Sequence, residues 1–133
     1  MKLIANQPAQ RDFMQDWKSQ ACAYVGGWGS GKSWAGARKL IHQHLYNAVD
    51  SRGRLTGCKS LAIAETHSQG ATLIIPSIES AADELGIEHR MLDPGKLRAI
   101  EFPRFSGPRD HQRSLISLAK IVRPIYFRQC LTY

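Results

Sequence analysis

The chain has 133 residues, a length that suits one domain with a buried core of its own. Hydrophobic residues make up 43% of it and charged residues 22%, a balance that excludes a disordered chain. The formal net charge of +7 favours encounters with polyanions without selecting one of them.

Cysteine usage and hydropathy narrow the class of protein further. Cys22, Cys58 and Cys130 are an odd number without a C-x-x-C pair, which argues against a disulfide framework and against a zinc site. No apolar run reaches the length of a signal-peptide core or of a membrane span. We therefore expect a cytoplasmic protein that has no contact with membranes.

The first half of the chain alternates between helical and extended patterns. Residues 8–20 predict a lead-in helix, and Ala21–Val25 predicts a short buried strand. A helix begins at Ser33, directly after a glycine-rich stretch, and Ser60–Ala64 predicts the next strand.

A further helix is predicted from about Gln69 to Leu85, where Pro76 should kink it and Gly86 should end it. His42 and His44 are two residues apart on the preceding helix and point in different directions. We expect them to be solvated or half-buried rather than a metal-binding pair.

The second half is shorter in its elements and more basic. Residues 87–92 and 98–102 predict two short strands on either side of the turn at 93–96. From Ser106 onward arginine and lysine outnumber acidic residues, and the apolar pattern allows a helix from His111 to Val122.

The strongest signal is the stretch Gly26–Ser33, GGWGSGKS, which matches G-x-x-x-x-G-K-[ST] at every required position. Glycines let such a loop turn its backbone N–H groups inward around a phosphate chain. Lys32 can reach the β- and γ-phosphates, and the hydroxyl of Ser33 is placed to bind Mg²⁺. The helix that starts there directs its positive dipole end at the same anion. The pattern therefore predicts ATP and Mg²⁺ as ligands.

The stretch PAQRDFMQDW, followed by AYVGGWGSGKSWAGARKLI, resembles the N-terminal ATPase region of bacteriophage terminase large subunits, the motors that package viral DNA. SLAIAETHSQGATLIIPSIESAADELGI and KLRAIEF are also similar to that family, in which a strand, a helix and a hairpin follow the loop. The likeness covers roughly residues 7–105. It implies an α/β fold with a partial P-loop NTPase core of the RecA-like (ASCE) class, a mainly parallel sheet flanked by helices.

The resemblance also implies roles for single residues. Gln10 matches the family's glutamine upstream of the loop, which contacts the adenine edge. Trp28 departs from the arginine that many members have there, so a transition-state role for that position is absent or supplied elsewhere. Lys32 is the expected catalytic residue and Ser33 the metal ligand. The full nucleotide-binding set is Gln10, Gly26, Gly27, Trp28, Gly29, Ser30, Gly31, Lys32, Ser33 and Trp34.

Hydrolysis in this family needs an apolar strand that ends in Asp, usually followed by Glu, and no such segment is found. We therefore expect a truncated or frameshifted ATPase with doubtful hydrolysis and without the nuclease. Residues 1–105 would be the ATPase part, and residues 106–133 a divergent basic tail, non-native or supplying a strand. The implied partners are double-stranded DNA and the family's portal and small terminase subunit in a bacterial host cell, with homo-oligomers only if the fold is complete. A decayed DNA- or protein-binding module and a small P-loop kinase remain alternatives.

Overall fold

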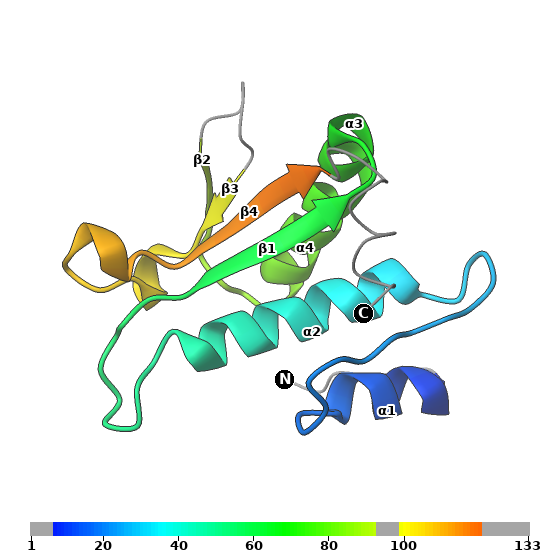
Figure 1. Cartoon of the computed structure of the whole chain (residues 1–133), viewed down its shortest axis with the longest axis horizontal. Coiled ribbons are helices and arrows are strands. Elements are labelled where there is room, and N and C mark those ends of the chain that lie inside the picture. Colours follow the sequence, from blue (N-terminus) through cyan, green and yellow to red (C-terminus); the bar gives the residue numbers. More distant parts are fainter. Residues whose placement is uncertain (1–6, 93–98, 121–133) are drawn as a thin grey trace, which may run out of the picture.

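The computed structural model of the chain describes residues 7–92 and 99–120 (Figure 1). The helices are α1 (Pro8–Gln15), α2 (Lys32–Asn47), α3 (His67–Gln69) and α4 (Ile75–Glu84), with a π-helical turn, η1 (Gly70–Ile74), between the last two. The strands are β1 (Lys59–Ala64), β2 (Arg90–Leu92), β3 (Ala99–Glu101) and β4 (Leu115–Lys120). Two short 3-10 turns are η2 (Pro103–Phe105) and η3 (Asp110–Gln112). The chain is thus a mixed α/β protein, as expected.

The four strands form one sheet in the order β1-β4-β3-β2. Among the described residues, β1 and β4 pair in parallel, whereas β4 with β3 and β3 with β2 pair antiparallel. The expectation of a mainly parallel sheet is therefore wrong. The described link between β3 and β4 explains part of this, because it holds two short 3-10 turns and no crossover helix, and parallel neighbours need a long crossover connection.

The helix that the pattern allowed from His111 to Val122 is not formed in the described residues. Residues 115–120 are strand β4 instead, and Ile116 and Leu118 are buried at 0% and 1% exposure on one face of it. That spacing of two residues is the strand period, which the apolar neighbours Leu115 and Ala119 hide in the sequence. Val122 lies outside the described residues.

The buried strand expected at Ala21–Val25 is also not observed. These residues run as an unpaired segment, and Val25 is 90% exposed. The side chain of Tyr24 packs toward α1, where its ring stacks on Phe13 with 5.5 Å between ring centroids. The described sheet thus lacks the strand that would lead into the glycine-rich loop.

Other predicted elements are confirmed with shifted ends. α1 stops at Gln15, earlier than expected, because the Asp16 carboxylate accepts hydrogen bonds from the backbone N–H groups of Lys18 and Ser19 and turns the chain. The helical stretch over His67–Glu84 contains a π-helical turn that ends at Ile74, two residues before Pro76. Gly86 ends it with φ +66°. The turn predicted at 93–96 lies outside the described residues.

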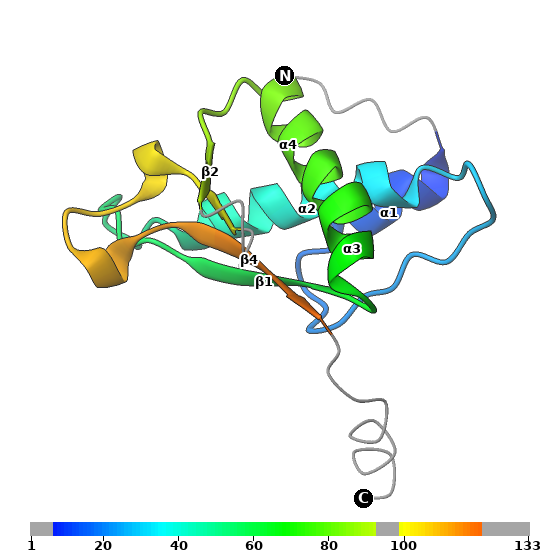
Figure 2. The ribbon, with the colours of Figure 1, turned by 90° about the horizontal axis from the view of Figure 1, so that it is seen from above.

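The core lies between the sheet and two helices. Figure 2 shows α2 and α4 on the same side of the β1–β4 pair. The largest apolar side chains in this layer are each exposed by 1% or less, namely Ile41, Ile75, Ile78, Ile100, Phe102, Ile116 and Leu118. The glycine-rich loop precedes α2 directly, so this packed layer holds the helix that the loop leads into.

Candidate functional site

Two glycines of the glycine-rich loop have left-handed backbone angles. Gly29 and Gly31 both have φ +74°, in the left-handed region that favours glycine. A Cβ atom at Gly31 would lie 2.2 Å from Nε2 of Gln10, and one at Gly26 would lie 2.6 Å from Oγ of Ser30. The backbone angles of Gly29 and Gly31 thus favour glycine at both positions, whereas the contact at Gly26 is with a side chain that can move.

The side chain of Lys32 lies across the loop. Its Nζ atom donates hydrogen bonds to the carbonyl oxygens of Gly26 at 2.7 Å and Gly27 at 2.6 Å. A third contact joins Nζ to Oγ of Ser30 at 3.2 Å. The Lys32 ammonium therefore lies within the loop, beside the N-terminal end of α2. The ammonium and the helix end are both sources of positive potential for a phosphate chain.

The residues after Lys32 differ in exposure. Ser33 is exposed in the first turn of α2 and borders a hollow of about 200 Å³ between α2 and the η1–α4 stretch. Trp28 extends into solvent from the tip of the loop and is fully exposed. Trp34 is half-buried, and the guanidinium carbon of Arg38 lies 3.8 Å from the centroid of its ring. The nucleotide contacts assigned to these side chains stay predictions.

Gln10 lies against the loop from α1. Gln10 is buried, with 7% of the residue exposed. Its Nε2 atom donates a hydrogen bond to the Ser30 carbonyl at 3.0 Å. The hydroxyl of Tyr24 donates to the same carbonyl at 3.2 Å. The structure thus brings Gln10 next to the loop, where it holds the backbone. Its contact with adenine stays a prediction.

Lys39 is a residue of this region that sequence reasoning missed. It is buried, 4% exposed, and its Nζ atom donates to the carbonyl oxygens of Phe13 at 2.5 Å and Asp16 at 2.7 Å. Those carbonyls lie at the end of α1, where no following helical turn donates N–H groups to them. Lys39 therefore fastens α1 to α2, and so keeps Gln10 beside the loop. No pattern in the sequence marks it, because Lys39 lies on the opposite side of the predicted helix from Ala37, Ile41 and His44.

Arg38 fastens α2 on its other side. Its guanidinium is buried and forms an ion pair with Glu84 at the end of α4, while Nη1 donates to the Trp34 carbonyl at 3.4 Å. Burial lowers the pKa of the Arg38 guanidinium. The loop-bearing helix is thus held by buried cations on both flanks.

His44 is wholly buried, which corrects the expectation of a solvated or half-buried ring. Its Nδ1 lies 2.7 Å from Oγ of Ser60, and its Nε2 lies 2.6 Å from Oγ of Ser114. Burial lowers the pKa of His44 to about 4, so the ring is neutral at pH 7. The histidine therefore joins α2 to β1 and to the residue before β4 as a structural group.

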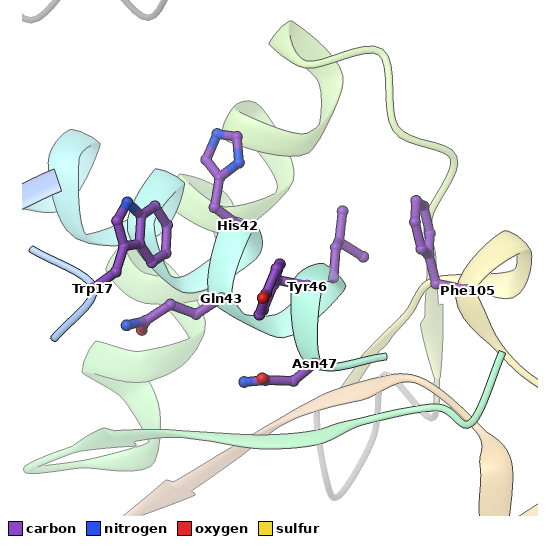
Figure 3. A pocket seen from close by; sticks show the side chains of 7 residues that line it. Trp17, His42, Gln43, Tyr46, Asn47 and Phe105 are labelled. Carbon is purple, nitrogen blue, oxygen red and sulfur yellow. The ribbon is translucent and has the colours of Figure 1, made fainter. Parts of the chain in front are cut away.

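A wider pocket of about 740 Å³ lies along the C-terminal half of α2 (Figure 3). It is lined by Trp17, His42, Gln43, Leu45, Tyr46, Asn47 and Phe105. Trp17 is 55% exposed there, and Nε2 of His42 is buried without a hydrogen-bond partner in the described part of the chain. None of the predicted nucleotide-binding residues lines this pocket.

In residues 7–92 and 99–120, no group of three or more His, Cys, Asp or Glu side chains could hold a metal ion. Among the same residues, no helix combines the length and the apolar content needed to cross a bilayer. No protein-family model matches the chain, and neither a curated protein nor a solved structure matches it.

Proposed function

We propose that this chain binds ATP with Mg²⁺ in the loop Gly26–Ser33. The observation that carries the proposal is the fixed ammonium of Lys32, bonded to two loop carbonyls beside the N-terminus of α2. A phosphate oxygen that displaced Oγ of Ser30 would keep Nζ fully bonded. Ser33, exposed one residue further, has the hydroxyl that suits Mg²⁺.

We further propose that the chain is the N-terminal ATP-binding part of a phage terminase large subunit. Its support is the ordered set of motifs over residues 7–105, together with the loop geometry and α2. The lead-in strand is not part of the described sheet, so a P-loop NTPase core rests on the loop and its helix alone. Double-stranded DNA and the family's portal and small subunit follow as proposed partners. Hydrolysis should be weak, because the sequence offers no acidic strand end to position Mg²⁺ and water.

Equilibrium dialysis with ATP and Mg²⁺ at millimolar concentration tests the nucleotide site. Lys32→Ala should lose binding by about tenfold or more, because it removes the charge that faces the phosphates. Lys18→Ala is the matched control, since Lys18 is an exposed lysine near the end of α1 and should bind as the wild type does. Unchanged affinity in Lys32→Ala would refute the site.

A non-catalytic DNA-binding module is the second candidate, favoured by the net charge of +7. Such a module would bind duplex DNA with an affinity that falls steeply with salt and is indifferent to ATP. A filter-binding titration at several salt concentrations, with and without ATP and Mg²⁺, separates the two. An effect of the nucleotide on DNA affinity that Lys32→Ala abolishes would favour the motor part.

A further inference from the structure

β1 is an edge strand of the described sheet, with β4 as its neighbour on one side and no described strand on the other. Its burial alternates: Ala62 and Ala64 face the core, whereas Lys59, Leu61 and Ile63 point outward. Leu61 and Ile63 are each 57% exposed, and Glu65, which follows the strand, is exposed as well. Every second residue from 59 to 65 thus forms one outward stripe, with a base at one end and an acid at the other.

The backbone of the same residues is directed at the open edge. The N–H of Leu115 donates to the Cys58 carbonyl at 2.8 Å, so the peptide groups that face β4 belong to residues 58, 60, 62 and 64. The N–H and C=O groups of residues 59, 61 and 63 therefore point away from β4. An open edge strand of this kind is a template for pairing with a further strand.

We propose that a second copy of this chain pairs with β1 along this edge, antiparallel and about a two-fold axis at Ala62. Leu61 then lies opposite Ile63 of the partner subunit, and Lys59 lies opposite Glu65 of the partner subunit. Both ends of the stripe gain an opposite charge, and the centre gains two aliphatic cross-strand pairs. All four outward side chains of each copy find a complementary neighbour in this single register.

The order of charges selects both the direction and the partner. Parallel pairing would place Lys59 against Lys59 of the partner subunit, and like charges directly opposite are unfavourable. Lys59 and Glu65 form no ion pair within the described residues, so both are available for this contact. Pairing through one six-residue strand buries less surface than a standard interface, which buries about 1,200–2,000 Å² in total. The dimer is therefore weak and concentration-dependent.

Charge reversal tests the pairing directly. Sedimentation velocity from about 10 μM to 1 mM, the range of a weak contact, should show a dimer that high salt dissociates. Lys59→Glu and Glu65→Lys should each lower the dimer affinity about tenfold or more, because each places like charges opposite one another twice. Arg52→Glu, in an exposed loop away from the stripe, should leave it unchanged.

Two recombinations of these variants make the test specific. The double variant with both reversals restores the opposite charges and should regain the wild-type affinity. An equimolar mixture of the two single variants should form a heterodimer, because every charged pair is then attractive, although each variant alone is monomeric. A monomeric wild type over the whole range, or single reversals without effect on its dimer, would overturn the proposal. Circular dichroism of each variant confirms the fold.

Discussion

Acid should weaken the fold through His44. The neutral ring is enclosed between Ser60 and Ser114, and burial lowers its pKa to about 4 from the usual value of 6.5. Between these two pH values the unfolded chain binds a proton at His44 that the folded chain does not. The free energy of unfolding should therefore fall as the pH falls from about 6.5 to about 4.

The magnitude follows from the two pKa values. A pKa unit is worth about 1.4 kcal/mol, so the loss from this group amounts to about 3 kcal/mol. It is complete at about pH 4 and absent above pH 7. Against a typical net stability of about 5–15 kcal/mol, a loss of this size is readily measured.

Urea unfolding at intervals between pH 7.5 and 4 measures the effect, with His44→Gln as the matched variant. Glutamine is neutral throughout and can hydrogen bond to both serines. Glu101 adds a separate loss at lower pH, because the hydrogen bond from Arg113 holds the pKa of its carboxyl below the usual range. Subtracting the variant's curve removes that contribution. Parallel curves for the two proteins would refute the buried neutral ring.

Two more predictions concern single contacts. Gly57→Ala should destabilise the fold by about 2–4 kcal/mol, because φ is +72° and the new Cβ would lie 2.0 Å from the Gln112 carbonyl oxygen. Gly53→Ala, at φ +76° with open space around it, should cost only about 1 kcal/mol in the same urea titration, and equal losses would contradict the steric reasoning. Glu84→Gln should cost about 1–2 kcal/mol, because it leaves the buried Arg38 without its counter-charge while Glu84 itself is half exposed to water. A thermal melt in low and high salt checks this, and an unchanged melting temperature would show that the ion pair contributes nothing.

Local patterns in the sequence predicted those elements that depend mainly on residues close together in the chain. The helical spacing after Ser33 and the apolar run at Ser60–Ala64 correspond to α2 and β1. Those features depend on residues close together in the chain. The resemblance assigned Gln10 a contact with adenine, which stays a prediction, and the structure shows its side chain bonded to the Ser30 carbonyl.

Contacts between distant residues could not be read in this way. Strand β4 lies between β1 and β3, and the segment at 21–25 lies outside the described sheet, because pairing depends on which strands meet in space. The contact of His44 with Ser114 spans 70 residues, and no local period reveals it. Charged residues on a helix usually face water, so the burial of Lys39 depends on the free carbonyls at the end of α1.

The imidazole between Ser60 and Ser114 also decides how β1 and β4 are aligned. Apolar burial alone would tolerate a slippage of two residues, since the same faces would still point at the helices. Such slippage would move one serine away from the His44 ring. One buried ring nitrogen would then have no hydrogen-bond partner, at a cost of about 1–3 kcal/mol. A polar contact thus selects one register of β1 against β4, whereas apolar side chains alone would leave several registers nearly equal in energy.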